Sequence, residues 1–194
     1  TSTTLKTYPS WDSHRLAEAL QDASRAQHEW SRMAFGARVE RMNRAAVLFH
    51  ERVDEYARLM ALEMGKSLRE GRAEVEKCAL ACDFYAVHAE HFIQTEMVQT
   101  DAGRSYVLYD PLGVVLGVMP WNFPFFQVIR FAAPALMAGN ACVLKHASNV
   151  PQCALALEQL FRDAGFPEHV FTTLMIEAAD VAGAIASRHV HAVT

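Results

Sequence analysis

Features that would identify a membrane, secreted or nucleic-acid-binding protein are missing from this sequence. Charged residues or histidines interrupt every long apolar stretch, so no run reaches the roughly 18 apolar residues of a membrane-spanning helix. The opening TSTTLKTYPSWD lacks the apolar segment of a signal peptide. The formal net charge is -4, and no basic stripe stands out. We therefore expect a cytoplasmic protein with neither a membrane nor a nucleic acid as partner.

Metal-binding and nucleotide-binding signatures are scarce as well. None of the four cysteines forms a CxxC pair. Cys78 and Cys82 stand four apart on an expected helix, where two thiolates could bind a metal, but no second cluster completes such a site. We expect no metal and reduced, buried cysteines. The GxGxxG fingerprint of ordinary dinucleotide-binding folds is also absent, because the two glycines of residues 113–117 lie inside an expected strand.

The first half of the chain has the periodicity of helices. With 194 residues, 52% of them hydrophobic, the chain can form a sizeable core. Asp12 or Ser13 is expected to cap a first helix. Apolar residues recur at three- and four-residue spacing over residues 39–63, which predicts an amphipathic helix that ends near Gly65. Another helix is expected over residues 69–91.

The second half alternates between strands and helices. Residues 104–110 alternate in polarity like a half-exposed strand, and residues 114–119 are continuously apolar like a buried one. Helices expected over residues 125–137, 151–164 and 179–187 separate further short apolar segments, the last of them VHAVT. This order predicts right-handed βαβ units and a parallel sheet. The expected fold class is α/β: a helical N-terminal region and half of a doubly wound, Rossmann-like sheet, truncated at its fourth strand.

Two polar clusters follow strands of this sheet, where ligands of open α/β sheets bind. The first holds Trp121 and Asn122 within PWNFP, and the second is KHAS, residues 145–148. Asn122 is either a turn residue bonded to its own backbone or a rigid amide donor suited to an oxyanion. Lys145 is either a solvated strand end or a contact for ribose or phosphate that Ser148 assists.

The order of the motifs resembles the N-terminal part of an aldehyde dehydrogenase. The resemblance rests on EMGKSLREGRAEVEKCA, DPLGVVLGVMPWNFPFFQVIRFAAPALMAGNACVLKHAS, DAGFPEHVF and VHAVT, from about Arg41 to the end. PWNFP followed by PALMAGN and a strand ending in lysine is highly specific. The resemblance implies oxidation of a small aldehyde with NADP or NAD. It also implies a helical part of the cofactor domain (1–103), a strand extension for oligomerisation (104–117) and half of the cofactor-binding sheet (118–194).

The resemblance assigns roles to individual residues. Asn122 matches the asparagine whose side chain helps to stabilise the thiohemiacetal oxyanion, which implies a catalytic role. Lys145 matches a lysine that contacts the adenosine ribose. A rigid donor between cofactor and substrate would explain the prolines and aromatic residues around Asn122. The implied cofactor-binding residues are Met119, Pro120, Trp121, Asn122, Lys145, His146, Ala147 and Ser148.

Two positions refine the expected cofactor and substrate. The family often has Lys-Pro-Ser-Glu where this chain has KHAS. A glutamate at position 148 would bind the ribose diol of NAD and repel a 2′-phosphate, whereas Ser148 leaves Lys145 free to attract it. We therefore expect NADP to be preferred over NAD. Arg130 matches an arginine that holds the distal carboxylate in succinate-semialdehyde dehydrogenases; its alternative role is a bond to a neighbouring helix or subunit.

The implied chemistry needs residues that this chain does not supply. The family uses a cysteine nucleophile and a glutamate general base, both expected beyond Thr194. Cys142 lies in an expected strand, and Cys153 lies near a helix start that could lower its thiol pKa, but neither has a neighbourhood that stabilises a thiolate. We expect the chain alone to be inactive. Three hypotheses remain: part of a homo-oligomeric succinate-semialdehyde dehydrogenase, a dehydrogenase for another aldehyde, or a non-catalytic fragment that binds nucleotide or full-length subunits.

Overall fold

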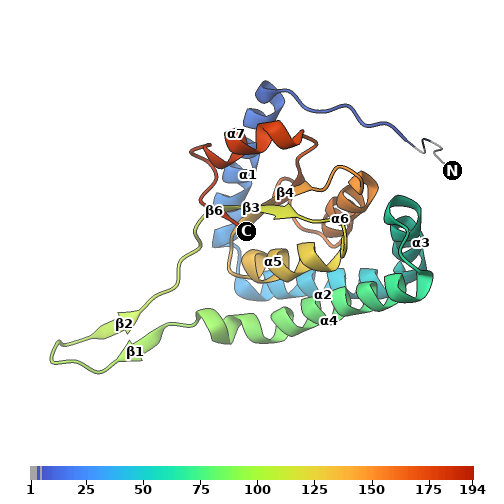
Figure 1. Ribbon diagram of the computed structural model, residues 1–194. Coiled ribbons are helices and arrows are strands. Elements are labelled where there is room, and N and C mark those ends of the chain that lie inside the picture. Colours follow the sequence, from blue (N-terminus) through green and yellow to red (C-terminus); the bar gives the residue numbers. More distant parts are fainter. Residues whose placement is uncertain (1–3, 5) are drawn as a thin grey trace.

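The computed structural model describes residue 4 and residues 6–194 (Figure 1). The first half consists of helices α1 (Ser13–Arg32), α2 (Phe35–Glu51), α3 (Val53–Met64) and α4 (Leu68–Ile93). A hairpin of β1 (Glu96–Val98) and β2 (Ser105–Val107) follows. The second half runs β3 (Val114–Met119), α5 (Phe126–Met137), β4 (Ala141–His146), α6 (Pro151–Asp163), β5 (Phe171–Thr173), the 3-10 turn η1 (Ala178–Asp180), α7 (Val181–Ile185) and β6 (Ala192–Val193).

The second half forms the predicted parallel sheet. Its strand order is β5-β4-β3-β6, and each neighbouring pair is parallel. The chain steps outward from β3 to β4 to β5 and then returns to place β6 on the other side of β3. This reversal is the topological switch of a doubly wound sheet, so the α/β prediction is confirmed. A ligand is expected outside the carboxyl ends of β3 and β6.

Helices cover both faces of the sheet. In Figure 1, α5 lies on one face with α2 and α4 beneath it, while α1 and α7 lie on the other. The strand period of two places alternate side chains in separate cores. Cys142 and Leu144 of β4 pack with the α2, α4, α5 and α6 side chains, whereas Ala141 and Val143 pack with α1. Burial on both faces explains why these strands are continuously apolar.

Local signals account for two of the helix ends. Asp12, not Ser13, caps α1, because its carboxylate accepts a hydrogen bond from the Arg15 amide at 2.8 Å. Gly65 ends α3 in the left-handed conformation, with φ of 78°, as its position predicts. The single helix predicted over residues 39–63 was wrong. The chain breaks at Arg52, which lies between α2 and α3 and pairs with Asp163 at 2.6 Å.

The β1–β2 hairpin extends away from the rest of the molecule (Figure 1). The strand expected over residues 104–110 is present as β2, and its antiparallel partner β1 was not foreseen. Met97, Tyr106 and Leu108 are apolar or aromatic, and each is more than half exposed. Among the described residues, no helix combines the length and apolarity needed to cross a membrane.

Candidate functional site

The loop after β3 carries the first polar cluster to the switch point of the sheet. Trp121 is 50% exposed, and Asn122 is exposed too. Within the described residues, the hydrogen bond recorded at Asn122 uses its backbone carbonyl and leaves the side-chain amide free. This arrangement differs from a turn asparagine bonded to its own backbone. It presents an amide donor to solvent at the place where the topology predicts a ligand.

Two buried charges anchor one side of this loop. The carboxylate of Glu74 on α4 accepts hydrogen bonds from the amides of Phe125, at 2.9 Å, and Phe126, at 3.0 Å. Lys66, in the turn before α4, forms an ion pair with Glu74 and donates to the Asn122 carbonyl at 2.8 Å. The loop and the start of α5 are therefore tied to the helical region.

His146 anchors the other side of the loop. Its Nδ1 accepts a hydrogen bond from the Ala147 amide at 2.8 Å, so its Nε2 carries the proton and donates to the Pro124 carbonyl at 2.9 Å. Burial lowers the pKa of His146, and the bond to Pro124 opposes that shift. The buried ring is thus held as one neutral tautomer between β4 and the loop.

The second polar cluster opens into a cavity of about 260 Å³ at the carboxyl ends of β4 and β5. Residues 145–148 form one wall, residues 173–177 form another, and residues 6–10 from the N-terminal segment close a third. A hydrogen bond of 2.7 Å from the Trp11 amide to the Met175 carbonyl holds that segment in place. Chain regions far apart in sequence therefore combine to make this cavity.

Lys145 supplies a partly available cation to the cavity. Its residue exposure is 8%, and Nζ donates to the His146 carbonyl at 2.6 Å. An ammonium has three donors, so two remain for a ligand. Burial lowers the pKa of Lys145, while the charge of Glu177 across the cavity raises it. With the exposed Ser148 beside it, this lysine suits a phosphate or a ribose hydroxyl.

The structure places the predicted site residues in two adjoining groups and one separate position. Lys145, His146, Ala147 and Ser148 all line the cavity. Residues 119–122 belong to the neighbouring loop, which a 3.1 Å hydrogen bond from the Ala147 amide to the Met119 carbonyl joins to the first group. Arg130 lies on α5, four residues after its first residue, and is exposed.

Sequence reasoning missed Lys66 and Glu74. The sequence signal that could have found Glu74 is a carboxylate within an apolar stripe, because Glu74 is on the same buried face of α4 as Cys78 and Cys82. Buried carboxylates are rare unless they are paired or hydrogen-bonded. A glutamate at that spacing indicates a specific partner, although its identity depends on contacts across 51 residues of chain.

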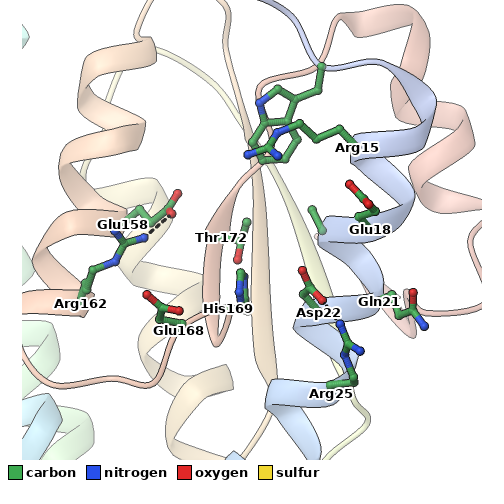
Figure 2. A pocket seen from close by; sticks show the side chains of 12 residues that line it. Arg15, Glu18, Gln21, Asp22, Arg25, Glu158, Arg162, Glu168, His169 and Thr172 are labelled. Atoms are coloured by element: carbon green, nitrogen blue, oxygen red, sulfur yellow. Dashed lines mark hydrogen bonds and ion pairs between the residues drawn. The ribbon is translucent and has the colours of Figure 1, made fainter.

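A larger cavity, of about 460 Å³, lies between α1, α6 and the start of β5 (Figure 2). Its lining carries charges of both signs, and Figure 2 shows Arg162 beside Glu158 and Arg25 beside Asp22. Arg162 pairs with Glu158 at 3.1 Å, and Arg25 also forms an ion pair with Asp22. These two pairs neutralise part of the charge in the lining. None of the predicted site residues lines it.

The cysteines of this chain are not activated nucleophiles. Burial raises the pKa of the Cys142 and Cys153 thiols. The start of α6 does not stabilise a Cys153 thiolate, because the carboxylate of Glu63 already accepts hydrogen bonds from the Gln152 and Cys153 amides, each at 2.8 Å. That negative charge raises the thiol pKa further. The result agrees with the expectation that neither residue serves as the nucleophile.

Residues 1–194 match the model of the aldehyde dehydrogenase family. The chain belongs to this family. A probable succinate-semialdehyde dehydrogenase [NADP(+)] of Synechocystis sp. is 51% identical over 176 residues, and a succinate-semialdehyde dehydrogenase [NADP(+)] of Deinococcus radiodurans is 43% identical over 194 residues. These alignments cover 91% and 100% of this chain but 39% and 41% of the relatives. The chain thus spans about two fifths of the length of these relatives.

Solved structures of the family share the fold. The crystal structure of succinic semialdehyde dehydrogenase from Streptococcus pyogenes, in complex with NADP+, superimposes with a TM-score of 0.94 at 35% identity. The superposition covers 97% of this chain and 42% of that protein. The helical region and half-sheet are therefore the architecture of an aldehyde dehydrogenase, as the resemblance implied.

Proposed function

We propose that this chain is the N-terminal part of an aldehyde dehydrogenase that oxidises succinate semialdehyde to the carboxylic acid with NADP. The cavity in which Lys145 and Ser148 stand together supports the cofactor assignment most strongly. Two relatives whose names specify succinate semialdehyde and NADP, at 51% and 43% identity, support the reaction. The nucleophilic cysteine and the general-base glutamate would lie outside the chain.

The residues of the cavity fit the adenosine end of NADP. The Lys145 ammonium has donors to spare, and Ser148 adds a hydroxyl without the negative charge of a glutamate. A 2′-phosphate would therefore meet a cation and a hydroxyl at the cavity wall. Residues 119–122 would form the adjoining wall. When bound, the cofactor supplies the hydride acceptor.

The substrate end of the proposed site involves Asn122 and Arg130. The free amide of Asn122 would donate a hydrogen bond to the oxyanion that forms when the aldehyde carbon is attacked. The exposed guanidinium of Arg130 would bind the distal carboxylate of succinate semialdehyde in a bidentate manner. The alternative is that Arg130 does not contact the substrate, in which case the site would accept an uncharged aldehyde.

The β1–β2 hairpin suits a role in assembly. Its exposed apolar side chains, Met97, Tyr106 and Leu108 among them, are carried on a two-stranded ribbon with open edges. An isolated two-stranded ribbon is marginal in water and gains stability by pairing. Residues 114–117 belong to the buried strand β3, so we propose that β1 and residues 104–113 join copies of the enzyme into a homo-oligomer.

Arg130→Ala in the complete enzyme tests the proposed substrate. Losing a hydrogen-bonded charge contact should raise KM for succinate semialdehyde by about 10- to 100-fold. KM for butanal, which has no carboxylate, should change little. Arg69→Ala, which removes an exposed arginine on α4, is the matched control. Equal effects on both aldehydes would refute the assignment of Arg130, and a wild-type kcat/KM that strongly favours NAD would refute the cofactor assignment.

A further inference from the structure

The ion pair between Lys66 and Glu74 is unusually well buried. The side chains are 8% and 1% exposed. By contrast, the pair between Arg72 and Asp54, also made by a residue of α4, is 50% and 53% exposed. Removing two charges from water is costly, and a well-packed apolar pair would often stabilise a fold equally well. The reason for this buried pair therefore lies in the contacts that Lys66 and Glu74 make with other residues.

Glu74 fixes the start of α5. One carboxylate oxygen accepts both the Phe125 amide and the Phe126 amide, while the other faces Lys66. These amides belong to the first turn of the helix, where backbone N–H groups lack partners within the helix. A carboxylate also interacts favourably with the positive end of the helix dipole. Glu74 therefore sets the point at which the loop after β3 becomes a helix.

Lys66 fixes the residue that carries the proposed oxyanion donor. Its ammonium donates to the Asn122 backbone carbonyl at 2.8 Å and lies 4.0 Å from the centre of the Phe123 ring. The side-chain amide of Asn122 has no such restraint within the described residues. Its direction depends on the backbone, and Lys66 holds that backbone directly.

We propose that Lys66 and Glu74 are positioning residues that orient Asn122 toward the reacting aldehyde oxygen. The proposal rests on the proposed function, because it assumes that Asn122 acts on an oxyanion. Lys66 would act through the Asn122 carbonyl, and Glu74 would hold both Lys66 and the helix start. Neither side chain would touch the substrate.

A double-mutant cycle on the complete enzyme tests this assignment. Asn122→Ala should lower kcat by about 10²- to 10³-fold, as expected for an oxyanion donor. Lys66→Met should lower kcat by about 10-fold, because a misplaced donor loses part of that effect. In the Asn122→Ala background, Lys66→Met should lower kcat less than about 2-fold, since the group it positions is gone. Equal losses in both backgrounds would overturn the proposal.

Further variants separate positioning from folding. Glu74→Gln keeps an acceptor for the helix amides but removes the charge that faces Lys66, so kcat should fall less than in Lys66→Met. Arg72→Ala, which breaks the exposed pair, should leave kcat unchanged. KM for the cofactor should stay within about 2-fold in Glu74→Gln, whereas a general loss of structure would change KM and kcat together.

Amide hydrogen exchange tests how the start of α5 is held, by a measurement that does not depend on enzyme activity. Glu74→Ala should accelerate exchange at Phe125 and Phe126 by about 10-fold or more and leave β4 unaffected, because both amides lose their acceptor. Unchanged exchange at these amides would overturn the proposal. A wild-type enzyme that oxidises no aldehyde would refute the proposed function and the catalytic part of this inference, whereas faster exchange would still establish Glu74 as the anchor of the start of α5.

Discussion

His146 should stabilise the Asn122 loop by an amount that depends on pH. The neutral ring donates to the Pro124 carbonyl and accepts from the Ala147 amide. His146→Phe keeps an aromatic ring but removes both bonds. The Ala147 amide retains a partner in the Met119 carbonyl at 3.1 Å, whereas the buried Pro124 carbonyl loses the donor of its bond. The variant therefore isolates the loss of that single donor.

One unsatisfied buried acceptor costs about 1–3 kcal/mol, which corresponds to roughly a 5- to 150-fold increase in local opening of the loop. The pH dependence adds a second signature. Burial lowers the pKa of His146 in the folded state, while the opened side chain titrates near 6.5. The opened state therefore binds more protons below pH 6.5. The stabilisation is complete above about pH 6.5 and declines, by at most about 1.4 kcal/mol per pH unit, as the pH falls toward the folded pKa.

Amide hydrogen exchange of residues 120–127, corrected for intrinsic rates at pH 7.5 and pH 5.5, measures both effects. The wild-type loop should open more readily at pH 5.5, and His146→Phe should open more readily at both values without that pH dependence. His50→Phe, which replaces an exposed histidine on α2, is the control and should behave like wild type. If His146→Phe kept the wild-type opening rate or its pH dependence, the assigned tautomer and its bond to Pro124 would be refuted.

Two further predictions concern the core. Burial and the Glu63 carboxylate raise the pKa of the Cys153 thiol, so Cys153 should resist iodoacetamide at pH 8 in the folded protein and react once the protein is unfolded. Equal alkylation rates of the folded and unfolded protein, measured by mass spectrometry, would contradict this prediction. Gly117→Ala should lower the free energy of unfolding by about 1–3 kcal/mol, since its Cβ would lie 2.4 Å from the Phe131 ring. At Gly36 in α2, nothing beyond its chain neighbours and the local helix backbone lies within 4 Å of a new Cβ, so Gly36→Ala should be neutral or stabilising in the same urea titration. Equal behaviour of the two variants would contradict the packing argument.

Sequence patterns over a few neighbouring residues predicted the strands, helices and helix ends that depend on those residues alone. The strand over residues 114–119 and the helix ending at Met137 match β3 and α5 because apolar period and burial coincide there. Asp12 and Gly65 follow capping rules that need only a few neighbouring residues. The order of strands and helices also placed Lys145 and Asn122 at the carboxyl ends of β4 and β3, where the topology predicts a ligand.

Contacts distant in sequence account for what the patterns missed. The break at Arg52 leaves the helical period almost intact, and its pair with Asp163 lies 111 positions further along the chain. The strand β1 has no alternating apolar face because all three of its residues are exposed, so only its pairing with β2 identifies it. The helical spacing of Glu74 with Cys78 and Cys82 indicates that Glu74 is buried, but it does not predict that its partners are the Phe125 and Phe126 amides.

The helical region does more than cover one face of the sheet. Glu74 binds the first amides of α5, and Glu63 binds the first amides of α6. In ordinary dinucleotide folds such helix starts bind phosphate, and glycines let the phosphate approach closely. Here a phosphate at either start would displace a protein carboxylate and meet its negative charge. If the proposed cofactor site at Lys145 is correct, an anionic ligand would avoid both helix starts, which would give a physical reason why these two strand–helix turns carry no GxGxxG sequence.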